Sequence, residues 1–153
     1  MRPSTNEPPS ADAASTPGPR VYLDRDAITV RRPADDRRVG ATQEIVPGAG
    51  EALRYLFEAR CDIVLVGRLP TELLHGLGVP VRFSGNVEAG EGATFLITAD
   101  PASCEHERTP GVTSILVGPH RPPGPRPTAH CDIEARDLAT AVMEILTHEA
   151  MTA

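Results

Sequence analysis

The sequence predicts an α/β fold, a single doubly wound and mostly parallel sheet with helices on both faces and no sizeable cap. Short apolar runs alternate along the chain with segments of helical period, which is the pattern of βαβ units. The runs are continuously apolar, as expected of strands that are buried on both faces of a parallel sheet. The 153 residues are enough for one domain with a core of its own.

The composition limits the domain organisation of the chain and the classes of partner that it can bind. Residues 1–20 are rich in Pro, Ser, Ala and Thr and have no hydrophobic period, so we expect a disordered tail before an α/β domain at 21–150. No secretory h-region and no membrane-length apolar run is present, so we expect a cytoplasmic protein away from membranes. The formal net charge of -6 disfavours nucleic acid, whose phosphates require a cationic face.

The first predicted strand, residues 21–23, is a short run of β-forming apolar residues. It ends in two aspartates with one residue between them, Asp24 and Asp26. In an extended chain residues two apart point the same way, so we expect these carboxylates on one side. The charged segment that follows, residues 31–46, has two interpretations, a flap near the strand end or a solvated loop.

A helix is predicted from Pro47, because Leu53, Leu56 and Phe57 fall at i, i+3 and i+4 and so share one face. The alternation then continues to the end of the chain. The predicted strands are residues 61–67, 79–83, 93–100 and 113–118, the predicted helices are 71–78 and 137–146, and a Pro-rich connector lies at 119–128.

Polar landmarks stand at the ends of the predicted strands: Asp24 with Asp26, Gly67 with Arg68, and Asp100. In doubly wound sheets, ligands bind outside the carboxyl ends of the strands. Carboxylates that converge there repel one another, and a hard divalent cation such as Mg²⁺ relieves the repulsion. The alternative is that these aspartates are ordinary turn formers and helix caps.

The three cysteines, Cys61, Cys104 and Cys131, are an odd number without a secretion signal, which argues against a disulfide framework. Cys104, His106, His130 and Cys131 also form a candidate zinc set. Their spacings are not those of structural zinc sites, and we favour unrelated residues in loops.

The ordered segments resemble the haloacid dehalogenase-like (HAD-like) superfamily. VYLDRDAI is similar to its first motif, an apolar strand followed by D-x-D-G-[TV]. The stretch that leads to the second motif is similar to EIVPGAGEALRYLFEARCDIVLVGR. The fourth-motif strand is similar to FLITAD, and the usual C-terminal part of the superfamily is similar to GVTSILVG together with the last helix. The likeness runs from Val21 to Leu146. It is strongest to the minimally capped branch of histidinol-phosphate and heptose-bisphosphate phosphatases, which also begin D-R-D.

The resemblance implies a phosphatase mechanism. Asp24 would attack the phosphorus of a phosphomonoester and form an aspartyl-phosphate. Asp26 would protonate the leaving oxygen and then activate water. Asp100 would hold Mg²⁺ together with Asp24 and the backbone carbonyl of Asp26.

The chain also departs from the family pattern. Ala27 and Ile28 replace the glycine and threonine of the first motif, and Gly67 stands where the second motif has a phosphate-binding Ser or Thr. After Asp100, the next acid, Glu105, comes one position late for the fourth motif.

The third motif usually supplies a lysine, and all 15 basic residues here are arginines. Arg68, Arg82 and Arg108 are the candidate replacements, although arginine is not geometrically equivalent to lysine.

The match and the departures leave three candidate functions. The first is a Mg²⁺-dependent phosphatase with an arginine in place of the lysine, acting weakly on a small phosphorylated substrate. The second is a catalytically inactive binding or regulatory module with a protein partner. A receiver-like phospho-acceptor ranks last, because that class also needs a lysine and a hydroxyl residue. The sequence carries no signal for an oligomeric state.

Overall fold

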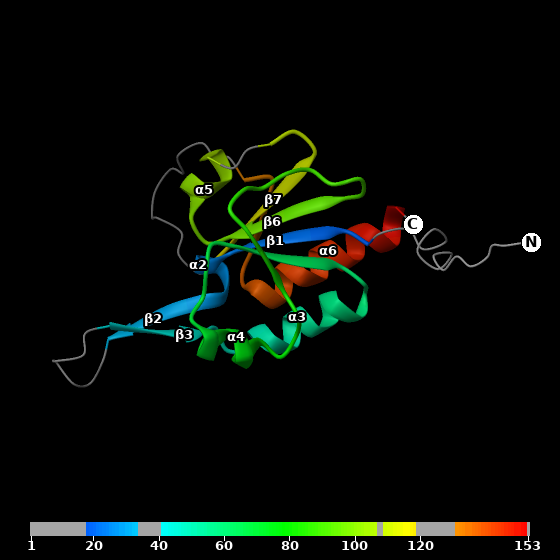
Figure 1. The fold of residues 1–153 in the computed structure, drawn as a ribbon. Helices are drawn as coiled ribbons and strands as arrows, with labels where there is room; N and C mark the ends of the chain where they lie inside the picture. Colours follow the sequence, from blue (N-terminus) through cyan, green and yellow to red (C-terminus); the bar gives the residue numbers. More distant parts are fainter. Residues whose placement is uncertain (1–17, 34–40, 107–108, 119–130, 153) are drawn as a thin grey trace, which may run out of the picture.

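The computed structural model of the chain describes residues 18–33, 41–106, 109–118 and 131–152 (Figure 1). Nearly all of the predicted tail at 1–20 and all of the Pro-rich connector at 119–128 lie outside the described residues.

A six-stranded parallel sheet forms the centre of the molecule, with the strand order β5-β4-β1-β6-β7-β8. Its strands are β1 (Arg20–Asp24), β4 (Asp62–Val66), β5 (Arg82–Ser84), β6 (Thr94–Thr98), β7 (Val112–Val117) and β8 (Ile133–Ala135). The predicted doubly wound sheet is confirmed. The chain runs from β1 outward to β5 and returns to β6 on the other side of β1, so the end of β1 is the switch point where such sheets bind ligands.

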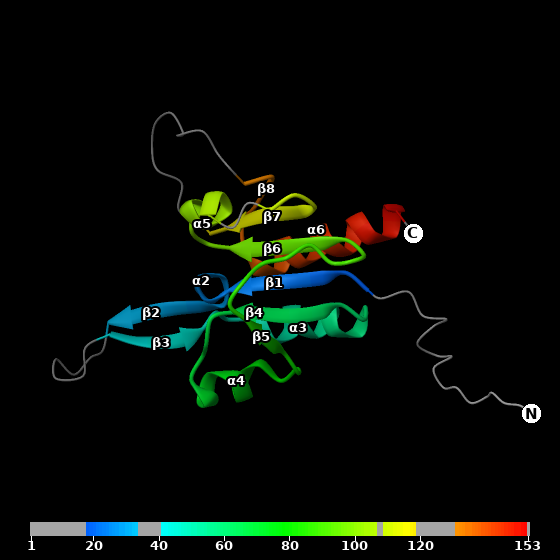
Figure 2. The same ribbon diagram turned by 45° about the horizontal axis from the view of Figure 1, so that its top comes forward.

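Helices lie on both faces of the sheet (Figures 1 and 2). Three of them contribute to the main core: α3 (Ala49–Glu58), α4 (Thr71–Leu77) and α6 (Leu138–Thr152). On the other face, α5 (Pro101–His106) contacts β6 and β7. That face carries a smaller apolar cluster around Tyr22, Val64 and Leu96.

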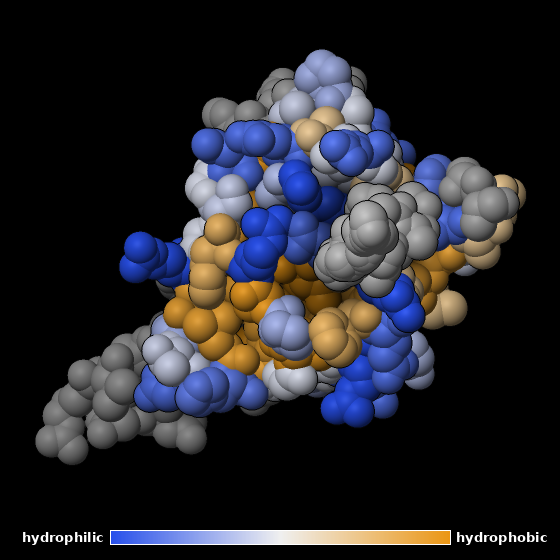
Figure 3. Space-filling model, turned by 45° about the vertical axis from the view of Figure 1, so that its right-hand side comes forward, coloured by the Kyte–Doolittle hydropathy of each residue, from blue (hydrophilic) through white to orange (hydrophobic). Residues whose placement is uncertain are grey.

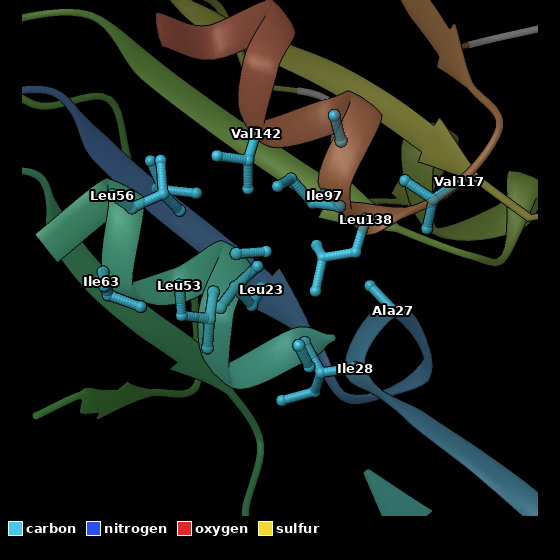
Figure 4. Close-up of a cluster of buried hydrophobic side chains, with 14 of the residues drawn as sticks. Leu23, Ala27, Ile28, Leu53, Leu56, Ile63, Ile97, Val117, Leu138 and Val142 are labelled. Atoms are coloured by element: carbon cyan, nitrogen blue, oxygen red, sulfur yellow. The ribbon is translucent and has the colours of Figure 1, made fainter. Parts of the chain in front are cut away.

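The main core lies between the sheet and the pair α3 and α6 (Figure 4). Side chains of alternate strand positions, such as Leu23 and Ile97, meet Leu53 of α3 and Val142 of α6 there, and all four are buried. Continuous burial on both strand faces explains why the strands are apolar at successive positions.

The helix ends follow the local sequence. Gly78 takes a left-handed conformation (φ 73°) at the end of α4, which glycine adopts without steric cost. Asp137 accepts a hydrogen bond from the Thr140 backbone N–H (2.8 Å) and thereby caps α6. The predicted face of α3 is right for Leu53 and Leu56 but wrong for Phe57, which is 48% exposed. The buried stripe runs through alanines instead, at 49 and 52.

Two antiparallel strands occupy nearly all of the described part of the charged segment for which a flap or a loop was expected. They are β2 (Thr29–Pro33) and β3 (Ala41–Ile45), which pair with each other. Figure 2 shows this pair of strands projecting from the edge of the sheet at which β1 ends. Between β1 and β2, the chain makes one short helix, α2 (Arg25–Ile28).

The expectation of unpaired cysteines is wrong for two of the three. Cys104 of α5 and Cys131, just before β8, form a disulfide, whereas Cys61 is buried as a free thiol. The paired residues are 27 positions apart, and the fold brings them together because α5 and β8 both adjoin β7. Counting cysteines cannot reveal this proximity. The bonded sulfurs are not free thiolate ligands, and His130 of the candidate zinc set lies outside the described residues.

The surface mixes apolar and polar areas. Figure 3 shows hydrophobic side chains gathered in the middle of one face, with hydrophilic side chains around them. Within the described ranges, no helix has both the length and the apolar character that crossing a membrane requires.

Candidate active site

Asp24 is the last residue of β1 and stands at the carboxyl edge of the central strand. It occupies the position before α2, yet its side chain makes no helix-capping hydrogen bond. Its Oδ2 instead accepts a hydrogen bond from the Thr98 hydroxyl on the neighbouring strand β6 (2.9 Å). The carboxylate is partly buried, and its other oxygen has no hydrogen-bond partner among the described residues. Within the described part of the chain, Asp24 therefore presents one fixed oxygen and one without a partner.

Asp26 lies in the first turn of α2, and its side chain is exposed. The sequence argument placed Asp24 and Asp26 on one side of an extended chain, but the strand ends at Asp24 and a helical turn begins at Arg25. Strand alternation therefore does not relate the two side chains. Ala27 and Ile28, which replace the first-motif glycine and threonine, are buried in the main core. They anchor α2 and leave Arg25 and Asp26 to solvent.

Asp100 follows β6 and precedes α5, and its side chain is exposed. Its Oδ1 accepts a hydrogen bond from the Ala102 backbone N–H (3.0 Å). The turn-and-cap role that the sequence analysis kept as an alternative is thus real for one oxygen of this carboxylate. The other oxygen has no partner among the described residues.

Thr98 connects Asp24 with Asp100. Its hydroxyl accepts a hydrogen bond from the Asp100 backbone N–H (3.1 Å) while it donates to Asp24. The side chain is fully buried, with 0% exposed, so water cannot replace it. The sequence analysis missed this residue, although a hydroxyl inside the apolar run FLIT directly before a site aspartate was a usable signal.

Gly67 and Arg68 follow β4, and both are exposed. The register pairs Asp24 with Val66, so Gly67 lies one residue beyond Asp24 at the same edge. The backbone of Gly67 has φ 99°, a conformation that favours glycine, and a Cβ built there meets no atom within 4 Å. Its N–H donates to the Ser84 carbonyl (3.3 Å). The edge has room for the hydroxyl side chain that the family pattern places here.

Arg82 is not among the residues that the structure brings to this edge. It is the first residue of β5, and its guanidinium donates two hydrogen bonds to Asp62 at the start of β4 (3.0 and 2.6 Å). Arg20, the first residue of β1, approaches the same carboxylate (Nε to Oδ2, 3.4 Å). The hydrogen bonds from Arg82 lower the pKa of the Asp62 carboxyl. This ion-pair group belongs to the amino-end half of the sheet, and Arg108 lies outside the described residues.

The donors at the edge fit a hard divalent cation in type. Asp24 Oδ2 has a second lone pair beside its bond to Thr98, and Asp100 retains a carboxylate oxygen without a described partner. Mg²⁺ binds through few carboxylates while keeping several waters. Among the described residues, no three His, Cys, Asp or Glu side chains gather closely enough to form a metal cluster. A cation held here would need a backbone carbonyl or water to complete its coordination.

The fold agrees with that of known phosphatases. A D,D-heptose 1,7-bisphosphate phosphatase from Burkholderia thailandensis matches with a TM-score of 0.54 and 17% identity, over 85% of this chain and 99% of that one. A 3-deoxy-D-manno-octulosonate 8-phosphate phosphatase from Moraxella catarrhalis, solved with magnesium and phosphate, matches with a TM-score of 0.57 and 15% identity, over 87% and 90%. A putative HAD superfamily hydrolase from Legionella pneumophila matches with a TM-score of 0.59 and 12% identity, over 86% and 83%.

Neither a family model nor a curated protein matches the sequence. The structural matches show that the chain has the HAD-like fold, and they confirm the resemblance found in the ordered motifs at the level of the fold.

Proposed function

We propose that this chain is a Mg²⁺-dependent phosphohydrolase of low turnover, which cleaves a phosphomonoester through an aspartyl-phosphate on Asp24. The observation that carries the proposal is the hydrogen bond from Thr98 to Asp24 Oδ2. It fixes one oxygen of a carboxylate at the switch point of a HAD-like sheet and leaves the other oxygen available. An aspartate that served only as a turn former would have no need of a fully buried partner on the next strand.

The chemical step needs two groups of this chain. The free oxygen of Asp24 attacks phosphorus, and the bond from phosphorus to the leaving oxygen breaks. Asp26, exposed in the first turn of α2, gives its proton to that leaving oxygen. In the second half, Asp26 takes a proton from water as the water oxygen attacks the phosphorus. Inorganic phosphate leaves, and Asp24 returns as a carboxylate.

The cation has a defined place in the proposal. Asp24, Asp100 and the backbone carbonyl of Asp26 are the groups that would hold Mg²⁺, and the ion would offset negative charge on the transferring phosphoryl group. Thr98 contributes indirectly, because its hydroxyl bonds to Asp24 and to the N–H of Asp100 at the same time.

Low turnover follows from what the edge lacks. Gly67 offers no side-chain donor to a phosphoryl oxygen, and the chain has no lysine. Arg82, one of the three candidate replacements, is engaged by Asp62, which leaves Arg68 as the described candidate for a phosphate contact. The loss of one transition-state donor typically costs about 10²–10³ in rate.

The same departures from the family pattern support a second candidate function, that of a catalytically inactive binding or regulatory module. It is favoured by Gly67 and by the diversion of Arg82 into an ion pair. Under the first function the partner is a small phosphorylated substrate, and under the second it is a protein. The two functions differ in whether Asp24 accepts a phosphoryl group.

The deciding experiment is calorimetry of Mg²⁺ binding with and without beryllofluoride, a mimic of the phosphoryl group on aspartate, on the wild type and Asp24→Asn. We expect the wild type to bind beryllofluoride only with Mg²⁺, and Asp24→Asn not to bind it. The matched control is Asp137→Asn, the same change at a helix cap, where asparagine is as good a capping residue as aspartate. A folded wild type that binds neither ligand would overturn the phosphohydrolase function in favour of the binding module.

A further inference from the structure

The helix α5 contacts β6 and β7, and few of its described side chains are buried. It has six residues, and isolated helices of that length are unstable in water. Among its residues with described side chains, only Cys104 is buried, with 1% exposed. At the other end, Asp100 holds the first turn through the N–H groups of Ala102 and Ser103. Among the residues of α5 with described side chains, the helix is therefore held chiefly by the buried sulfur of Cys104 and by the Asp100 cap.

The buried sulfur is bonded to a firmly held partner segment. Cys131 precedes Asp132, whose carboxylate accepts hydrogen bonds from the backbone N–H (2.9 Å) and the hydroxyl (3.2 Å) of Ser114 on β7. The Asp132 N–H donates in return to the Ser114 hydroxyl (3.0 Å). The disulfide thus ties a weakly attached helix to the edge of the sheet.

Space beside the disulfide allows α5 to move. A cavity of about 300 Å³ is lined by Cys104 together with Leu96, Ser114 and Asp132, among others. Close packing normally opposes the displacement of a buried side chain, and the described residues leave open space on this side of Cys104. The partner sulfur belongs to Cys131, which is only partly buried and so more open to attack by a reductant.

The third cysteine is shielded from the same chemistry. Cys61 is buried, and its burial raises the pKa of its thiol to about 12, with the charge of Glu149 adding to the effect. Thiolates rather than thiols react with disulfides and oxidants. Redox chemistry in the described part of the chain is therefore directed to Cys104 and Cys131.

We propose that the Cys104–Cys131 disulfide is a redox latch that holds α5, and with it Asp100, at the carboxyl edge of the sheet. A dithiol reductant opens the latch. Its thiolate attacks Cys131 Sγ, the bond between the two Sγ atoms breaks, and Cys104 leaves as a thiolate that is then protonated. The second thiol of the reductant displaces Cys131, so the protein gains two electrons and two protons, and the reductant becomes a disulfide.

The latch regulates the candidate active site through Asp100. This residue is both the cap of α5 and a proposed cation ligand. Release of α5 therefore breaks the hydrogen bond that holds the Asp100 side chain. The effect on cation binding rests on the proposed function, whereas the effect on α5 does not. Oxidised protein is the competent form, and reduced protein binds Mg²⁺ more weakly.

The test compares hydrogen exchange of the α5 amides in oxidised wild type, wild type reduced with dithiothreitol, and Cys131→Ser. Amides of β1 report on the core, and Cys61→Ser is the matched control that keeps the disulfide. Thiol titration of the denatured protein should count one thiol when oxidised and three when reduced. We expect α5 exchange to rise about 10-fold on reduction and in Cys131→Ser, with β1 unchanged, and Mg²⁺ binding by calorimetry to weaken.

The other outcomes are decisive as well. Three thiols in air-oxidised protein, unchanged exchange of α5 after full reduction, or an equal rise in β1 would each overturn the latch. Loosened α5 with unaltered Mg²⁺ affinity would overturn its regulatory role. Loosened α5 with no Mg²⁺ binding in either state would support the latch and remove the proposed phosphohydrolase function instead.

Discussion

The Thr98 hydroxyl donates a hydrogen bond to Asp24 Oδ2 across two adjacent strands, over 2.9 Å. A hydroxyl has one proton to give, and the alternative acceptor, the Asp100 carbonyl, lies farther away at 3.5 Å. The N–H of Asp100 occupies an acceptor position of the same oxygen. One buried hydroxyl therefore sets the orientation of Asp24 and links it to Asp100.

Replacement of Thr98 by valine should lower kcat for phosphomonoester hydrolysis by about 10²-fold, because the attacking carboxylate loses its fixed orientation. The same change should destabilise the fold by about 1–3 kcal/mol, since valine leaves buried polar groups without a partner. Steady-state kinetics and urea unfolding measure the two effects. Thr98→Ser keeps the hydroxyl, and it should restore most of kcat while still losing the packing of the methyl group. Equal kcat values in the valine and serine variants would contradict a positioning role.

The sheet could be predicted because burial on both faces leaves a direct mark on the sequence. The runs that contain β4, β6 and β7 are apolar at successive positions, and this pattern survives without knowledge of tertiary contacts. The ends of the strands could be placed for the same reason, so Asp24, Gly67 and Asp100 were correctly located at or just beyond strand ends.

Relations between segments distant in sequence could not be predicted in the same way. Arg82 was a candidate phosphate ligand, but its side chain extends toward Asp62, a choice that depends on the register of β4 and β5. The disulfide of Cys104 depends likewise on the placement of α5 and β8 beside β7. No local pattern encodes such distances. Thr98 was missed because its role requires the pairing of β1 with β6.

Gly67→Ser should raise the rate of hydrolysis by about 10-fold or more, because one transition-state donor is worth up to about 10²–10³. The site has room, since no atom lies within 4 Å of a Cβ built there. The positive φ of 99° makes any side chain strained, so stability should fall by about 1–3 kcal/mol. Gly67→Ala is the matched control, with the same strain and no hydroxyl. An equal activity of the two variants would show that the added hydroxyl does not reach the phosphoryl group.

Arg68 and Arg82 are both exposed arginines at sheet strands, and they should respond differently to substitution by glutamine. Arg68→Gln removes the candidate phosphate-binding arginine that follows β4, so we expect KM for a phosphomonoester to rise, or beryllofluoride affinity to fall, by several fold. Arg82→Gln removes a partner of Asp62 and should leave both values within error. A large effect in Arg82→Gln and none in Arg68→Gln would reverse the assignment and place the phosphate elsewhere.

The ion pair of Asp62 and Arg82 should contribute to stability in a pH-dependent way. Hydrogen bonds from Arg82 hold the pKa of the Asp62 carboxyl below its ordinary value, so the unfolded chain binds this proton more readily than the native protein does. The contribution is therefore fully present above the unfolded pKa, about 3.9, and is lost as the pH falls through the lower native pKa. The pair is largely exposed, so we expect only about 0.2–1 kcal/mol.

Urea unfolding of the wild type and Arg82→Met at pH 7 and at pH 2.5 measures this contribution. The two proteins should differ at pH 7, and the difference should shrink at pH 2.5, because protonation of Asp62 removes the charge that pairs with Arg82. Arg68→Met is the control, because Arg68 has no carboxylate partner within the described ranges, and its difference from the wild type should not depend on pH. A difference for Arg82→Met that stays constant down to pH 2.5 would mean that the stem of Arg82 stabilises by packing and that its charge contributes nothing.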